Sequence, residues 1–231
     1  GASVTAATSG VLGYGVPQLK ITAPSSAITT FMIGAAAFGT PLSSPGISAE
    51  LMPVVDQADG VTGLACTALS ANNALAVKGK IALVDRGICA FSIKVKNAQN
   101  AGAVGVLVAD NAAGSPPPGL GGADPTVTIS AARVTQATGV QLKGLLSKRS
   151  RTRSGIFVNL GVDMSQLAGA DKQGRALMFT PNPYQGGSSV SHYDTSAFPN
   201  LIMEPSISGD LTLSVTPPKD LTLPLFKDIG W

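Results

Sequence analysis

Residues 80–108 constrain the fold of this chain more than any other segment. Lys80 to Val84 reads KIALV and Val104 to Val108 reads VGVLV, and both runs are short and apolar. Between them, residues 90–101 place apolar side chains at spacings of four, three and three, which is the period of an amphipathic helix. Gly102 then provides a natural helix end. A strand, a helix and a strand joined by short links predict a parallel crossover, and therefore an α/β fold.

Shorter apolar stretches on either side of this unit predict further strands and one more helix. The strands are expected at Leu19–Ala23, Phe31–Phe38, Ile47–Val55, Val127–Ile129 and Ile156–Val162. The helix is expected at Thr135–Leu146, with Val140 and Leu145 on its buried side. Pro53 predicts that the third of these strands lies at an edge or carries a bulge. The expected fold class is α/β and β-rich, with mixed sheets forming a compact sandwich or open barrel flanked by about two helices.

The chain is expected to have three parts. Residues 1–16 are small, polar and without period, which is typical of a linker or a remnant of a preceding domain. Residues 17–162 form the domain, and residues 163–231 form a loop-rich extension in which prolines interrupt every candidate helix. No apolar run approaches the roughly 20 residues that span a bilayer. The start at Gly1, without Met, is interpreted as the mark of a processed or engineered fragment.

Charge is scarce and unevenly placed. Charged residues make up 13% of the chain, about half the usual share. The net charge of +3 comes from one run, Lys148, Arg149, Arg151 and Arg153. Because no aromatic residue interleaves with this run, we interpret it as a solvated loop and expect no nucleic-acid partner, with a polyanion patch as the alternative. Asp56 and Asp59 alone fall short of a calcium loop.

The cysteine and histidine counts narrow the chemistry. Cys66 and Cys89 allow one pairing, and chains with so little charge are commonly exported, where such pairs oxidise. A disulfide would close a loop of about 24 residues and stabilise the fold by about 3 kcal/mol; two reduced, buried thiols are the alternative. The single histidine, His192, excludes an H-E-x-x-H zinc helix within this chain. We expect a secreted protein, extracellular, periplasmic or at the cell surface.

Gly79 to Asn111 reads GKIALVDRGICAFSIKVKNAQNAGAVGVLVADN. This segment resembles the protease-associated domain, in which a strand is followed by Arg-Gly, a Cys, a Phe, a basic helix ending in Ala-Gly, and an apolar strand. The matching residues are Arg86, Gly87, Cys89, Phe91, Lys94, Lys96, Ala101 and Gly102. The segment DPTVTISAARVTQATGVQLKGLL fits the strand and helix that close the domain, so the resemblance covers about residues 17–162.

This resemblance implies a non-catalytic module that recognises protein substrates or regulates access to an active site. Arg86 is expected in a structural ion pair, and Phe91 in the core beneath the helix. Because function tends to lie on loops held by a rigid scaffold, a protein-binding surface is expected at the turn and in the loop that follows the second strand. Its residues are Arg86, Gly87, Pro116, Pro117, Pro118 and Leu120. An ordinary long connection is the alternative for the loop.

The tail carries a second resemblance. Gly187 to Leu211 reads GSSVSHYDTSAFPNLIMEPSISGDL, which is similar to the end of leishmanolysin-like zinc proteases. That resemblance implies that His192 is the third zinc ligand and Met203 the turn methionine beneath the metal in an intact parent protease. Without the H-E-x-x-H helix, we expect neither bound zinc nor peptidase activity in this chain alone. Its partners would be the parent's catalytic domain and protein or peptide substrates. A surface histidine with a packed methionine is the alternative.

Two other functions stay open. A self-contained secreted hydrolase would draw a nucleophile and its partners from Ser188, Ser189, Ser191, His192 and Asp194, but these lie too close together on one loop, and no G-x-S-x-G elbow occurs. An extracellular carbohydrate-binding sandwich would need clustered aromatic side chains. Those of this chain are scattered: Tyr14, Tyr184, Tyr193 and Trp231.

Overall fold

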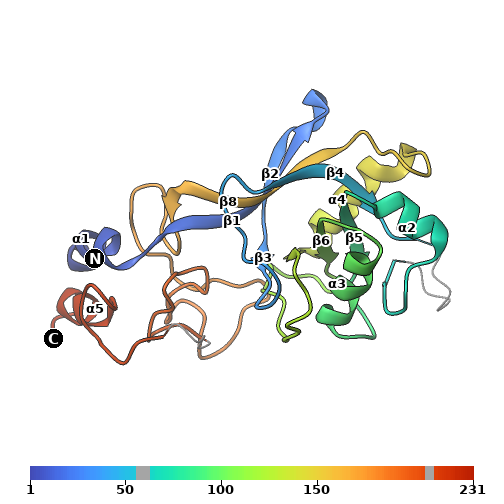
Figure 1. The fold of residues 1–231 in the computed structure, drawn as a ribbon. Helices are drawn as coiled ribbons and strands as arrows, with labels where there is room; N and C mark the ends of the chain where they lie inside the picture. The colour runs from blue at the N-terminus through green and yellow to red at the C-terminus, as the bar shows by residue number, and fades with distance from the viewer. Residues whose placement is uncertain (56–62, 206–210) are drawn as a thin grey trace. The chain divides into compact units, whose positions relative to one another are not determined.

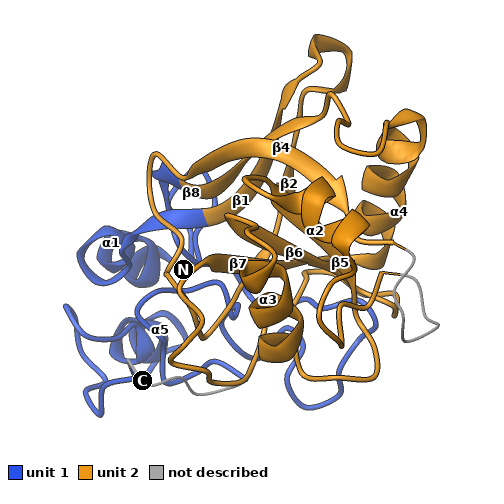
Figure 2. Cartoon of the chain, turned by 45° about the vertical axis from the view of Figure 1, so that its right-hand side comes forward, with its two compact units in different colours: residues 1–16, 163–231 blue, residues 17–162 orange. Residues whose placement is uncertain are grey.

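A computed structural model describes residues 1–55, 63–205 and 211–231. The chain divides into two compact units, residues 17–162 and residues 1–16 together with 163–231 (Figure 2). The loop that carries Asp56 and Asp59 lies outside the described residues. Within them, no helix has both the length and the hydropathy that a bilayer crossing requires.

A mixed sheet of eight strands organises the described residues, in the order β2-β1-β8-β4-β5-β6-β7-β3 (Figure 1). The strands are β1 Tyr14–Ala23, β2 Thr29–Met32, β3 Gly34–Ala35, β4 Ile47–Pro53, β5 Ile81–Asp85, β6 Gly105–Ala109, β7 Ser130–Val134 and β8 Phe157–Leu167. Strands β4 to β7 run parallel, whereas β8 and β3 pair antiparallel with β4 and β7. The expected α/β fold class, with a mixed sheet and a parallel β5–β6 pair, is confirmed.

Helices pack on both faces of the parallel strands. Successive residues of a strand point to opposite faces of the sheet, and the apolar residues of β5 and β6 are buried on both. The helices are α2 Ala71–Val77, α3 Phe91–Asn100 and α4 Gln136–Leu145, with short 3-10 turns η1 Ser25–Ala27 and η2 Leu146–Lys148. Val106 of β6 packs with Val95 of α3 in one core cluster. The next residue, Leu107, packs with Leu142 of α4 in another. Two apolar layers therefore enclose the sheet.

Three details of this unit differ from the sequence-based expectations. Phe31–Phe38 forms no single buried strand, because β2 and β3 divide it and Met32 is exposed. Val140, expected inside, is exposed, and α4 buries Gly139 and Leu142 instead. Strand β4 lies between β8 and β5 despite Pro53. Pro53 is its last residue, beyond the part paired with β8, so no ladder donor is missing there.

The unit formed by residues 1–16 and 163–231 has two helices in its described part, α1 Ala2–Val11 and α5 Thr222–Asp228. Although the first residues show no clear period, α1 buries Val4, Thr8 and Val11. The Asp228 carboxylate accepts hydrogen bonds from the amides of Val4 and Ser3, both at 2.9 Å, and these bonds lower the pKa of Asp228 to about 2.

The expectation that prolines prevent every helix after Asp163 was wrong for α5. Pro224 lies in the first turn of this helix, where an amide has no helical acceptor and a proline is tolerated. Leu221 is fully buried at the start of the helix, and Leu225 packs against the same cluster of apolar side chains. Packing therefore outweighs the low helix propensity of proline at this position.

Candidate functional site

A charged cluster occupies the carboxyl ends of the parallel strands. Asp85 of β5 is paired with Ala109 of β6, so the following residues, Arg86 and Asp110, emerge at the same edge. The Asp110 carboxylate accepts a hydrogen bond from Arg86 Nη1 at 2.8 Å and another from Arg133 Nε at 2.7 Å. The structural ion pair predicted for Arg86 is therefore present. Arg133 was missed because the strand was expected three residues earlier, at Val127–Ile129.

This cluster stays charged near neutral pH. Burial alone would raise the pKa of Asp110, but the hydrogen bonds from Arg86 and Arg133 outweigh it and hold the pKa below its usual value. The Arg133 guanidinium also lies 5.7 Å from the centre of the Phe91 ring, which packs against the core as expected. A carboxylate kept ionised by two guanidinium groups is a poor general acid or base near neutral pH. The cluster is suited to holding the turn in place.

The turn after β5 presents an apolar side chain to solvent. Gly87 has a φ of 144° and Ile88 a φ of 58°, and 84% of the Ile88 surface is exposed. A β-branched residue in the left-handed region is an outlier that the surrounding structure must enforce. The predicted disulfide between Cys89 and Cys66 is present and fastens the next residue. Ile88 is therefore held in a strained conformation between an ion pair and a disulfide.

The side chain of Lys94 contacts the disulfide that fastens this turn. Its side chain is fully buried, and its Nζ donates a hydrogen bond to the Leu64 carbonyl at 2.8 Å and lies 3.5 Å from Cys66 Sγ. The family resemblance includes Lys94 only as one of the lysines of a basic helix and does not predict its burial. A usable signal was the spacing of three from Phe91 and four to Ala98, which puts Lys94 on the apolar stripe of α3.

The loop of residues 115–122 only partly matches the predicted surface. Leu120 is buried, its amide donates to the Ala35 carbonyl at 3.1 Å, and its carbonyl accepts from the Ala37 amide at 2.9 Å. Pro117 is buried as well, whereas Pro118 is exposed and Pro116 half-buried. Leu120 and Pro117 are therefore removed from the predicted binding surface, because they attach the loop to the core beside β3.

In the other unit, the backbone brings the segments of His192 and Met203 together. The Tyr193 amide donates a hydrogen bond to the Met203 carbonyl at 2.8 Å, and Met203 packs against the apolar cluster of its unit. The His192 Nδ1 lies 2.9 Å from Ser191 Oγ. Throughout the described residues, no group of three or more His, Cys, Asp or Glu side chains is placed to hold a metal ion. The described residues do not by themselves form a zinc site.

Of the contacts that a self-contained hydrolase would need, the described residues show only the one between Ser191 and His192. The Asp194 carboxylate accepts hydrogen bonds from the amide and hydroxyl of Ser196, at 3.0 and 2.6 Å. No hydrogen bond joins it to His192 in the described part of the chain, so Asp194 does not serve there as the third group that orients a catalytic base. Ser189 is buried and accepts from the Gln185 amide at 2.9 Å. Tyr193, one of the four scattered aromatic residues, is buried too.

The comparisons with known proteins bear on the first unit. Residues 48–142 match the family model of the PA domain, which confirms the protease-associated resemblance for this part of the chain. The chain is 41% identical over 70 residues to the probable lipoprotein aminopeptidase LpqL of Mycobacterium tuberculosis, covering 30% of this chain and 14% of that protein. It is 42% identical over 89 residues to vacuolar-sorting receptor 3 of Arabidopsis thaliana, covering 35% of this chain and 13% of the receptor.

Solved structures give a looser likeness. An aminopeptidase from Aneurinibacillus sp. strain AM-1 matches 67% of this chain and 32% of its own, with 25% identity and a TM-score of 0.47. The chain thus spans about a third of that enzyme and a much smaller part of the two relatives above. The similarity of Gly187–Leu211 to leishmanolysin-like proteases stays a prediction.

Proposed function

We propose, on the premise that residues 48–142 form a PA domain, that this chain is a non-catalytic recognition module of a secreted zinc metalloprotease. In this proposal the module contacts folded protein substrates and so regulates their access to a catalytic domain elsewhere in the parent protein. The relatives support a shared module rather than a shared reaction. One is named an aminopeptidase and another a sorting receptor, yet both match this chain over a short segment, of 70 and 89 residues.

The single observation that carries the proposal is the exposed, strained Ile88. An apolar side chain that is 84% exposed is stabilised by no packing of its own, and its positive φ adds a conformational cost of about 1–3 kcal/mol. The Arg86–Asp110 ion pair on one side and the Cys66–Cys89 disulfide on the other offset that cost. A residue held in this way is pre-organised for contact with a partner, which lowers the entropy lost on binding.

Export is part of the proposal. A disulfide persists where the surroundings are oxidising, as they are in extracellular and periplasmic compartments. The cysteines also lie beside the turn that we assign to recognition, so reduction would loosen the proposed surface.

The test uses the full-length parent protease carrying Ile88→Gly. Glycine removes the side chain and favours the positive φ, so the fold should be kept or slightly stabilised. We expect kcat/KM for a folded protein substrate to fall at least about fivefold, as for loss of an interface residue worth more than 1 kcal/mol. The value for a short peptide substrate should not change.

Val140→Ser is the matched control, because Val140 is another exposed apolar residue and lies on α4. It should leave both substrates unaffected. Equal losses for protein and peptide, no loss for either, or the same loss with the control would each show that Ile88 does not serve recognition.

A second role is proposed for the tail: His192 would complete a zinc site only together with ligands from another part of the parent protease. The Tyr193–Met203 hydrogen bond favours it, because it sets the two segments side by side as a ligand followed by a methionine turn requires. In the intact parent, His192→Ala should lower the zinc content measured by atomic emission, and Ser191→Ala should not. Unchanged zinc in the His192 variant would exclude the role.

A further inference from the structure

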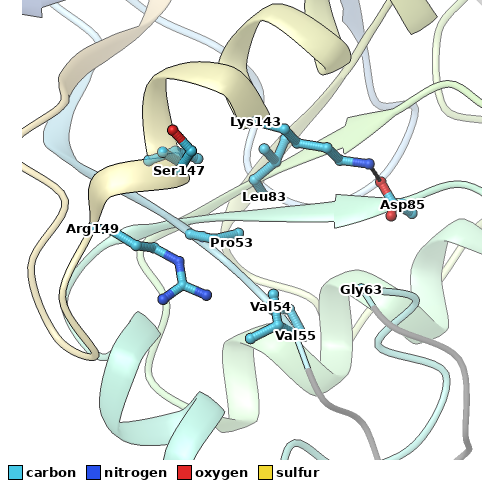
Figure 3. A pocket seen from close by; sticks show the side chains of 10 residues that line it. Pro53, Val54, Val55, Gly63, Leu83, Asp85, Lys143, Ser147 and Arg149 are labelled. Carbon is cyan, nitrogen blue, oxygen red and sulfur yellow. Dashed lines mark ion pairs between the residues drawn. The ribbon is translucent and has the colours of Figure 1, made fainter.

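A cavity of about 370 Å³ opens at the carboxyl ends of β4 and β5, on the side where α4 ends (Figure 3). Its apolar lining comes mainly from Pro53, Val54, Leu83 and Leu146. Its volume lies at the lower end of the range of roughly 300–1,000 Å³ typical of small-ligand sites. The cavity has room for one or two amino-acid residues rather than a long peptide, and it contains neither Ile88 nor any residue of the loop 115–122.

One side of the cavity is formed by the last turn of α4 and by the 3-10 turn η2 that follows it. Lys143, Leu146 and Ser147 follow the spacing of three and four that sets side chains above one another. Lys143 Nζ forms an ion pair with Asp85 Oδ1 at 2.5 Å across the cavity (Figure 3). Because 29% of the Asp85 side chain stays exposed, its carboxylate can still accept another hydrogen bond.

Arg149 supplies a positive charge at the opposite wall. In the described part of the chain, the hydrogen bonding of its guanidinium is limited to a long contact of 3.5 Å with the Ser150 carbonyl, and no ion pair is formed there. Among the described side chains that line the cavity, Lys143, Arg149 and Asp85 together carry a net charge of +1. The rest of the basic run, Lys148, Arg151 and Arg153, is exposed next to it. The chain directly after the basic run is held by the Glu50 carboxylate, which accepts hydrogen bonds from the amides of Ser154 and Gly155 at 2.6 and 2.8 Å.

These features match one kind of ligand. A phosphate ion would leave the apolar lining unused, and an apolar molecule would leave Arg149 without a partner. A polypeptide carboxyl terminus with an apolar last side chain would use the guanidinium, the Asp85 carboxylate and the apolar lining together. Its carboxylate would pair with the guanidinium, its amide N–H would donate a hydrogen bond to Asp85, and its side chain would pack against the apolar lining. One carboxylate also balances the net charge of Lys143, Arg149 and Asp85.

We propose that this cavity binds the carboxyl-terminal residue of a polypeptide chain, with Arg149 pairing with the terminal carboxylate. The site goes beyond the recognition surface at Ile88. The two share no residue, so failure of either proposal leaves the other standing.

Binding can be tested by titrating the isotope-labelled 231-residue chain with N-acetyl-Ala-Leu and following its backbone amide signals by NMR. We expect the signals of Leu83, Ser147 and Arg149 to shift. N-acetyl-Ala-Leu-amide, which lacks the carboxylate, should bind at least about tenfold more weakly, because a charge-assisted bidentate contact is lost. Octanoate, a carboxylate without an amide N–H, should also bind more weakly.

Arg149→Gln should raise the dissociation constant for N-acetyl-Ala-Leu about tenfold or more, and Arg149→Lys should recover part of the loss. Arg151→Gln is the matched control, because Arg151 belongs to the same run without lining the cavity; it should change the constant less than twofold. Ser147→Trp, at an exposed helix position, should fill the mouth and abolish binding.

Four results would overturn the assignment: no shift with the unmodified chain up to the solubility limit of the peptide, equal binding of acid and amide, equal losses with Arg149→Gln and Arg151→Gln, or octanoate binding as tightly as the peptide. The last result would identify the site as one for fatty acids.

Discussion

Replacing Gly139 by alanine tests how closely α4 packs on the sheet. A Cβ at Gly139 would lie 2.7 Å from the Cβ of Ala109, at the end of β6, whereas carbon atoms in good contact are about 3.5–4.0 Å apart. Gly144 lies in the same helix, and a Cβ there would meet nothing within 4 Å. The same substitution at these two positions therefore isolates the packing effect.

The two substitutions share a gain in helix propensity of about 1 kcal/mol. At Gly144 nothing opposes that gain, so we expect stabilisation by about 0.5–1 kcal/mol. At Gly139 overpacking costs about 1–3 kcal/mol, because β6 is paired on both sides and Ala109 cannot easily retreat. The variants should differ by about 1–3 kcal/mol. At about 2–4 °C per kcal/mol, that is a difference in Tm of about 2–12 °C.

The assay must report on residues 17–162, which contain neither tryptophan nor tyrosine. Far-ultraviolet circular dichroism or calorimetry is therefore suitable, whereas intrinsic fluorescence would follow the other unit. Combining Gly139→Ala with Ala109→Gly removes the clashing methyl and should restore most of the lost stability. If Gly139→Ala stabilised the chain as much as Gly144→Ala does, the inferred close contact between α4 and β6 would be refuted.

Two further predictions concern the turn at Ile88. Asp110→Asn leaves the Arg133 guanidinium, 9% exposed, without its counter-ion and should cost about 3 kcal/mol in urea unfolding at pH 7. Because the pKa of Asp110 is lowered on folding from 3.8, its stabilising effect is complete above about pH 4 and is lost as the pH falls through the folded value; a gap between wild type and variant that does not narrow as the pH is lowered below 4 would contradict this. Replacing both Cys66 and Cys89 by serine should cost about 3 kcal/mol by the same measurement, and an equally stable double variant would show that Lys94 and the core alone hold the loop.

The central crossover was predictable because its signals are local. The runs KIALV and VGVLV and the helical spacing between them identify β5, α3 and β6 to within one or two residues. The disulfide followed from having only two cysteines in a chain of exported composition. Each of these inferences needed only residues that are close in the sequence, or the number of cysteines in the chain.

The rest of the site depends on pairings that sequence does not reveal. Arg133 reaches Asp110 only because β7 lies next to β6, and Leu120 is buried only because its segment bridges to Ala36 beside β3. The burial of Lys94 was not predicted, because the Leu64 carbonyl that accepts its hydrogen bond belongs to a segment 30 residues away in the sequence. Contacts between distant segments decide all three.

The neighbouring positions of β1 and β8 in the sheet have a consequence for gene architecture. Residues 17–162 leave the other unit along β1 and return along β8, and these two strands are adjacent. A segment whose two ends lie side by side can be inserted into a host loop, or excised from it, without stretching the host. Residues 17–162 therefore meet the condition that insertion of a domain into a host chain requires, because the strands by which they begin and end are neighbours in one sheet.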